Sequence, residues 1–520
     1  MKPFTLILLF ILLPVVLFAQ VSSGSDEKEW GKADSLLQQG FPESAGKIAQ
    51  NLYDKARQRG DQVYMMKAQL FMMTASFQRS ERAFEDAIVT AEQQSQTTSF
   101  PANAIWQSIA AQLYWNYYQQ HRYNIHQRTR VEAAQEIADF AQWDASRFFA
   151  RASALYKASL QQSAELEKIP IAKYDPLLIK GKNTRHLRPT LFDLLAFRAM
   201  DYLENDEKDI TQPAFAFVMN DARAFSPASE FINTDFKTGD TTSLQYQALR
   251  LYQRILSLHI DDGSKDAMID ADLHRLQFAY NKSVHPDKSN LYKAALQKLA
   301  DANASNPLSA LASLRIAQIM MGTERTRADY DAPLGENEKK PTDFALIRKR
   351  LESIIAAHPK SEGGMMARQL LQQILAKDLN LVVEGVVLPG EPSRMLISYR
   401  NVPSASIRLV KLNSREHKWI GTSYGNTEKM LSELLKRSAY KQWETMLPSS
   451  GDYERHSTEV KIEALEKGVY AVIISANNDF SQQENAISYT VFQVSSLSII
   501  RNETENFVLN RKTGVPVPDV

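Results

Sequence analysis

Cysteine is absent from this chain of 520 residues. Its absence excludes disulfide bonds, cysteine-containing zinc sites and a lipid-modified cysteine at a processing site. Excess charge is also nearly absent, because 61 Lys and Arg against 60 Asp and Glu leave a net charge of +1. No basic stripe that could follow a phosphate backbone is present, so nucleic acid is not expected as a partner.

The longest apolar run lies at the N-terminus. It extends from Phe4 to Ala19, follows Met1 and Lys2, and precedes a polar stretch at 21–25. A positive start, an apolar run shorter than the about 20 residues of a transmembrane helix and a small residue at its end are typical of a signal peptide. Residues 1–20 are therefore predicted to be a signal peptide, and the protein to be exported to the periplasm, the cell envelope or the exterior. An uncleaved anchor is the alternative, and membrane contact is expected only in that case.

Residues 21–378 show apolar side chains at helical spacing. Ala45, Ile48, Leu52 and Ala56 share one helix face, and Gly60 separates that helix from the next. Helix, short turn, helix is the pattern of stacked helical hairpins, so we predict an all-α domain of tetratricopeptide-like hairpins. A strict 34-residue period does not continue along the chain. Further helices are expected at 102–121, 131–142, 145–166, 190–204, 243–259, 266–281, 288–302, 307–320, 342–357 and 362–376.

The longest irregular segment of the helical part is expected at 210–242. Five phenylalanines lie along it, at positions 215, 217, 225, 231 and 236. Each buried aromatic ring removes a large apolar area from water, so the spacing favours a segment pinned to a helical surface. A ligand-binding segment is the alternative.

Apolar residues begin to alternate with polar ones near residue 379. Strands are expected at 381–388, 395–400, 405–410, 457–462, 468–475 and 487–494, with a polar helix at 427–446. About six short strands at this spacing predict an antiparallel β-sandwich at 379–499. The fold class is therefore α+β in separate domains. Residues 500–520 are predicted to begin a further, truncated sandwich, in which the strand at 507–517 has no ladder partner.

Several of these stretches resemble bacterial alpha-2-macroglobulins. In the β part, the similar residues are 399–402, 468–473 and 507–517, the last with Arg511, Thr513, Gly514 and Pro516 in the order that opens a macroglobulin-type sandwich. In the helical part, residues 113–118, 128–129, 143–144 and 188–196 are similar to the N-terminal extension of the Bacteroidetes branch of this family. The resemblance covers most of residues 28–520.

The resemblance implies a role but no chemistry for this chain. Family members are large exported proteins that trap proteases, often with a Cys–Gln thioester, and a chain without cysteine cannot form that thioester. The chain is then expected to be a non-catalytic N-terminal segment, a helical adaptor followed by the first sandwich domain. Its partners would be proteins, among them proteases that bind through a C-terminal part not contained in this sequence. The alternative is a stand-alone exported helical-repeat protein that binds proteins or scaffolds a surface complex.

No enzyme is predicted. The chain contains no GxSxG, HExxH or phosphate-binding glycine loop, and its carboxylates lie mainly on polar helix faces. We therefore assign no catalytic, cofactor-binding, metal-binding or thioester residue, and no cofactor.

Three residue groups suggest sites, and each has a simpler structural interpretation. His285, Pro286 and Asp287 resemble the loop of a J-domain co-chaperone, but Pro and Asp are ordinary in a turn between helices. His121 and His126 are five residues apart, whereas metal-binding pairs on a helix are three or four apart, so a hydrogen-bonded or exposed pair is expected. The aromatic residues of the helix at 102–121 could stack on a sugar, but their spacing favours the core. These aromatic residues are Trp106, Tyr114, Trp115, Tyr117 and Tyr118.

Overall fold

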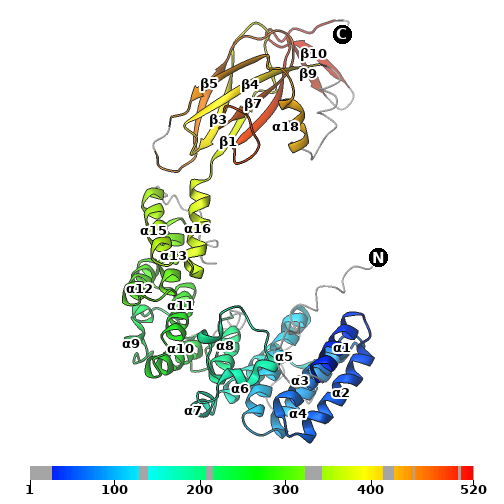
Figure 1. Ribbon diagram of the computed structural model, residues 1–520, viewed down its shortest axis with the longest axis vertical. Helices are drawn as coiled ribbons and strands as arrows, with labels where there is room; N and C mark the ends of the chain where they lie inside the picture. The colour runs from blue at the N-terminus through cyan, green and yellow to red at the C-terminus, as the bar shows by residue number, and fades with distance from the viewer. Residues whose placement is uncertain are drawn as a thin grey trace. The chain divides into compact units, whose positions relative to one another are not determined.

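The computed structural model describes residues 26–127, 139–205, 215–322, 342–413, 427–448, 451–501 and 505–518. The predicted signal peptide, most of the predicted helix at 131–142, residues 128–129 of the family resemblance and residues 210–214 of the irregular segment lie outside these ranges. The chain divides into two compact units, 1–312 and 313–520, and the division falls within α13 (Ser309–Met320) (Figure 1). Within the described ranges, no helix is long and apolar enough to cross a membrane.

The first unit is helical. Its α-helices are α1 (Asp26–Gln38), α2 (Pro42–Gln58), α3 (Gln62–Ser76), α4 (Ala83–Thr97), α5 (Ala102–His126), α6 (Ala145–Ser159), α7 (Ser163–Leu166), α8 (Leu191–Leu203), α9 (Ala228–Phe231), α10 (Leu244–Asp261), α11 (Lys265–Lys282) and α12 (Lys288–Ala302). Short 3-10 helices are η2 (Phe140–Gln142), η3 (Ile171–Leu177), η4 (Arg185–Leu187) and η6 (Ala222–Phe225). Consecutive helices pack against each other, as in α1–α2, α2–α3, α4–α5, α5–α6 and α10–α11 (Figure 1).

Polar side chains cap the first turn of several of these helices. Asp61 accepts a hydrogen bond from the backbone of α3, Asp144 from that of α6 and Ser243 from that of α10, which satisfies otherwise unpaired amide groups. One predicted helix, 145–166, is interrupted between α6 and α7. There the Ser159 hydroxyl donates to the Tyr156 carbonyl at 2.7 Å, a local bond that competes with helix continuation.

The described part of the irregular segment is pinned to the helices, as expected for most of its aromatic rings. Phe225, Phe231 and Phe236 are buried, and Phe217 packs edge-on against a tyrosine of α10. Phe215 is instead 67% exposed. Buried side chains of α10 and α11 also donate hydrogen bonds to carbonyl groups of the segment.

The second unit joins a helical hairpin to β-sheets. Its helices are α15 (Phe344–Ala357), α16 (Glu362–Leu375) and α18 (Thr427–Leu435). Its strands are β1 (Asp378–Val383), β2 (Val386–Val387), β3 (Ser393–Arg400), β4 (Ser404–Leu412), β5 (Lys441–Met446), β6 (His456–Ile462), β7 (Gly468–Ser475), β8 (Ile487–Val494), β9 (Leu497–Arg501) and β10 (Asn506–Asn510).

The strands form three sheets. Their orders are β1-β3-β6, β2-β8-β7-β4-β5 and β10-β9. The single strand predicted at 381–388 is two strands, and β2 pairs with β8 in parallel, so the second sheet is mixed rather than purely antiparallel. The general order of helices followed by strands agrees with the prediction.

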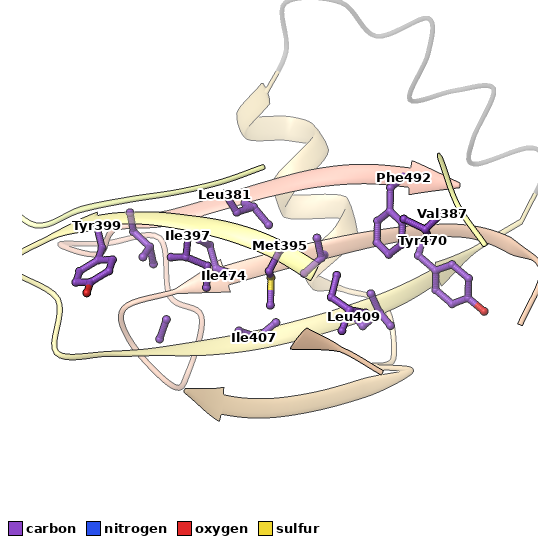
Figure 2. Packing of buried hydrophobic residues seen from close by; sticks show 14 of the residues in the cluster. Leu381, Val387, Met395, Ile397, Tyr399, Ile407, Leu409, Tyr470, Ile474 and Phe492 are labelled. Carbon is purple, nitrogen blue, oxygen red and sulfur yellow. The ribbon is translucent and has the colours of Figure 1, made fainter. Parts of the chain in front are cut away.

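One hydrophobic core lies between the first two sheets. Leu381 and Ile397 come from the three-stranded sheet, and Ile407 and Ile474 come from the five-stranded sheet (Figure 2). All four are buried and belong to one cluster. On the opposite face of β4 and β7, apolar side chains of α18 cover a second cluster. Strands β4 and β7 are therefore buried on both faces, which explains their nearly continuous apolar sequences.

The helix predicted at 427–446 is wrong in its second half. Helix α18 ends at Leu435, and residues Lys441–Met446 form β5, which pairs antiparallel with β4. Most side chains of β5 are exposed because it is an edge strand with a solvent-facing side. Its sequence consequently lacks the alternation that identifies a half-buried strand. The segment is a strand because its backbone hydrogen-bonds to β4.

The predicted absence of a partner for the strand within 507–517 is also wrong. Strand β10 pairs with β9 over five residue pairs, from Asn506 opposite Arg501 to Asn510 opposite Leu497. The hairpin therefore begins before the predicted boundary at 500. The backbone of this hairpin is paired, but several of its apolar side chains are exposed to solvent.

The helical hairpin α15–α16 is bonded to the sheets. The Asn401 side-chain amide donates to the carbonyl groups of Ile374, at 2.7 Å, and Ala376, at 3.1 Å. Arg348 of α15 also bonds the hydroxyl of Tyr453. The separate folding of residues 21–378 and 379–499 stays a prediction.

Candidate binding pocket

A pocket in the first unit lies among α3, α5, η3 and α8. Its volume is about 100 Å³, and it is partly open to solvent. Most of the lining is aliphatic, with one tyrosine, one glutamine and one arginine. The lining residues are Leu70, Ile105, Ile109, Gln112, Leu113, Tyr174, Leu177, Leu178, Leu194, Leu195 and Arg198.

Helical periodicity brings these residues to one place. On α5, Ile105, Ile109 and Leu113 are spaced by four residues, so they share a face of that helix. On α8, Leu194 and Arg198 are related in the same way. The segment containing η3 is held beside α8 by backbone hydrogen bonds, with 2.9 Å between the Ile171 nitrogen and the Pro189 oxygen and 2.8 Å between the Leu191 nitrogen and the Ile169 oxygen.

Arg198 is the cationic residue of the pocket. Its Nε donates to the hydroxyl of Ser108 at 2.9 Å, and its Nη2 donates to the side-chain oxygen of Gln112 at 2.6 Å. Both partners are on α5 and both are neutral. Among the described residues, no carboxylate oxygen lies within 4.0 Å of the Arg198 guanidinium. The positive charge is therefore oriented by hydrogen bonds but not neutralised by a salt bridge.

The surroundings of Arg198 disfavour its charge. Burial lowers the pKa of Arg198 from its ordinary value, while the fields of Tyr156 and Asp201 raise it by less. Burial also raises the pKa of Tyr156, to about 12, and the pKa of the Asp201 carboxyl. A half-buried guanidinium next to aliphatic side chains is costly, so a negative charge brought into the pocket would be stabilised there.

Helix α8 carries Arg198, and hydrogen bonds hold the N-terminus of this helix in place. Thr190 and Asp193 form a capping box, with 3.2 Å from the Asp193 nitrogen to the Thr190 hydroxyl and 2.9 Å from the Thr190 nitrogen to the Asp193 carboxylate. The second oxygen of Asp193 lies 2.8 Å from Nε2 of His259 on α10. Helix α8 is thereby anchored to α10 as well as to the η3 segment.

His285, Pro286 and Asp287 form the turn between α11 and α12. The backbone nitrogen of Asp287 donates to Nδ1 of His285 at 3.1 Å, and Asp287 accepts from the side-chain amide of Asn290 at 2.6 Å. Both side chains are therefore used inside the turn, which agrees with the turn interpretation.

His121 and His126 are not brought together with other metal-binding groups. The His121 ring packs against Tyr117, with 4.4 Å between ring centroids. Nε2 of His126 lies 2.9 Å from the Tyr118 hydroxyl. Over the described residues, no group of three or more His, Asp or Glu side chains could hold a metal ion.

The aromatic residues of α5 belong to the core, as expected. Trp106, Tyr114, Tyr117 and Tyr118 are buried, and the half-buried Trp115 stacks on Tyr118 with 5.3 Å between ring centroids. Rings of α6 and of the η2 segment fill the remaining space around them.

Sequence reasoning missed the pocket, although one signal was available. Helix α8 reads as an apolar helix with a single basic residue, Arg198, on the face of Leu194 and Leu195. An unpaired cation on such a face is unusual and indicates either a buried salt bridge or a ligand.

Comparison with known proteins adds no identification. Neither a protein-family model nor a curated protein sequence matches this chain. The family resemblance therefore stays a proposal, and the pocket is interpreted from its own chemistry. The lining combines an apolar wall with one positive charge.

Proposed function

We propose that this chain is a non-catalytic binding segment of an exported protein similar to bacterial alpha-2-macroglobulins. In this proposal the helical unit is an adaptor that binds another molecule, and the sheets of the second unit are a macroglobulin-type sandwich. The observation that carries the proposal is the pocket beside α5 and α8, whose lining can hold a ligand but lacks a nucleophile with an adjacent base.

The second unit supports the family part of the proposal. Two sheets contribute to one core, which is the arrangement of a sandwich. The residues that resemble the opening of a macroglobulin domain also have a structural task. Gly514 has a φ of +72°, and the Asn510 side chain accepts from the backbone nitrogens of Lys512 and Thr513. Substituting these residues would disturb a tight turn, which gives a physical reason for that motif.

The size and location of the native protein test this proposal. An antibody raised against the helical unit should detect, in the cell-envelope or secreted fraction of the source organism, a polypeptide much larger than the 58.9 kDa of this chain. A band near that mass would favour the stand-alone scaffold, and a cytoplasmic band would contradict export.

The trapping role needs a separate assay on the native protein. A protease enclosed by a large protein should lose activity on a large protein substrate and keep activity on a small peptide substrate. The same protease mixed with serum albumin is the control. Equal loss on both substrates, or no loss on either, would remove the protease-trapping part of the proposal.

A further inference from the structure

The pocket described above has an oriented cation and an apolar wall, and together they define a ligand class. We propose that the pocket among α3, α5, η3 and α8 binds a carboxylate that carries a short branched aliphatic chain. The carboxylate would pair with Arg198, and the aliphatic chain would lie against Ile105, Ile109 and Leu195. This inference goes beyond the proposed function, because it depends on the pocket alone and not on the family of the protein.

The charge of Arg198 is the first argument. Two other partly buried arginines of the same unit bond a carboxylate: Arg151 bonds Glu92, and Arg188 bonds Asp270. Even the fully buried Arg275 bonds Asp272. Arg198 has neutral hydrogen-bond partners only, so it lacks the counter-ion that these three arginines have within the chain. A carboxylate ligand would supply it.

The free donors of Arg198 are the second argument. A guanidinium has five N–H groups, and two of them are used by Ser108 and Gln112. Nη1 makes no hydrogen bond to a described residue, and Nη2 retains a second N–H. These adjacent groups match the two oxygens of a carboxylate, which bind such a fork through parallel hydrogen bonds. Ser108 and Gln112 hold the guanidinium in place, so little side-chain freedom is lost on binding.

The size and surface of the pocket are the third argument. The volume of about 100 Å³ is smaller than the roughly 150 Å³ of an apolar cavity that binds benzene. A branched chain of leucine size suits such a space, whereas a long acyl chain does not. Tyr174 also lines the pocket, and its hydroxyl makes no hydrogen bond to a described residue. It offers one further donor for an amide or carboxyl oxygen.

Two sources could present this chemistry: a free branched-chain acid and the C-terminal leucine of a peptide. In the experiment the probes are titrated into the full chain, and binding is measured by ligand-observed NMR and by calorimetry. The probes are 4-methylpentanoate, N-acetyl-leucine and a tripeptide that ends in leucine, each paired with its neutral amide. We expect a dissociation constant of about 1 mM or lower for the best acid, and at least about tenfold weaker binding of its amide.

Two variants test the assignment of the site. Arg198→Met should weaken binding of the acid to the level of the amide, and Ile109→Trp should fill the pocket and abolish binding of both. Arg57→Met, on the exposed end of α2, is the matched control and should bind like the parent chain. Thermal unfolding checks the fold of each variant, and the comparison of acid with amide on the parent chain needs no variant.

Each outcome decides something. Tighter binding of the free acid indicates a small metabolite, and tighter binding of the peptide indicates a protein C-terminus; both support the proposal. Equal affinity of acid and amide would overturn the role of Arg198. Absence of binding by every probe, or unchanged binding by a folded Ile109→Trp variant, would overturn the site.

Discussion

His259 on α10 and Asp193 on α8 form a buried pair, with 2.8 Å between Nε2 of the imidazole and Oδ1 of the carboxylate. The other ring nitrogen, Nδ1, lies 3.3 Å from the carboxylate of Asp262. Both ring nitrogens therefore face carboxylates, and when the imidazole is protonated each of them can donate a hydrogen bond. The same Asp193 caps α8, so this pair connects the start of the helix that carries Arg198 to α10.

The first prediction concerns the removal of this pair. His259→Gln leaves the buried Asp193 without its cationic partner, so the helical unit should lose about 3 kcal/mol of unfolding free energy. Urea unfolding followed by amide hydrogen exchange in α8 and α10 measures the loss. His186→Gln is the control, because that half-exposed histidine lies 3.7 Å from Asp266 and should matter little. Equal effects of the two substitutions would contradict the prediction.

The second prediction is the pH dependence of the same pair. Burial by itself lowers the pKa of His259. Asp193 and Asp262 together raise that pKa by more than burial lowers it, so the net shift is upward from the ordinary value of 6.5. A raised folded-state pKa gives stability that is fully present below about pH 6.5 and is lost as the pH rises through the folded-state pKa. The unfolding midpoint of the parent chain should therefore fall from pH 6.5 upward, and the His259→Gln variant should show a shallower fall. A parallel fall in both proteins would count against the pair.

The third prediction concerns Asp34 on α1. Burial raises the pKa of Asp34 from 3.8 to about 6, and the nearby Lys67 offsets part of that shift. Because the folded state then binds a proton more tightly than the unfolded state, the free energy of unfolding should fall as the pH rises from about 4 to about 6. Asp34→Asn should remove that fall, whereas Asp54→Asn on the exposed face of α2 should leave it unchanged. Thermal unfolding at several pH values is the measurement, and a pH profile unaffected by Asp34→Asn would disprove it.

The fourth prediction concerns the junction between α16 and the sheets. Asn401 has a φ of +56° and donates to two carbonyl groups at the end of α16. Asn401→Gly keeps that backbone conformation but removes the hydrogen bonds, so it isolates their contribution. Limited proteolysis between 376 and 379 should accelerate roughly fivefold for each bond lost, equivalent to about 1 kcal/mol. If the cutting rate does not change, these bonds do not hold the junction.

The fifth prediction concerns the hairpin β9–β10. Ile500 and Phe507 face each other across it and are 53% and 49% exposed. Exposed apolar pairs on a two-stranded sheet favour association with other chains. Replacing both with Thr should reduce concentration-dependent association in sedimentation experiments. The control is Val89→Thr, an isolated exposed residue of α4, which should have no effect.

Regular helices were the most predictable part of this protein. The helix expected at 288–302 has those bounds in the structure, and the one expected at 190–204 differs from α8 by one residue at each end. Both have a sustained apolar period between clear turns or capping residues. Such signals are local, because a helix satisfies its backbone within its own segment.

The β region was less predictable because its elements depend on partners. Strand β5 carries no apolar alternation and exists because β4 offers it a hydrogen-bonding edge. Strand β10 was recognised as a strand, yet its partner β9 was not. Strand pairing joins residues that are distant in sequence. The composition of a polar edge strand therefore gives little indication that the segment pairs, or with which strand.

The sequence by itself determined the absence of thiol chemistry, the order of helical and β regions and the positions of most helices. Each depends on composition or on contacts within about one helical turn. Only the tertiary structure decided where the pocket lies and which charges are neutralised. Arg198 and Ser108 are 90 residues apart, and His259 and Asp193 are 66 apart. Helix packing brings such residues together, and the local pattern around each contains no information about which neighbour it will meet.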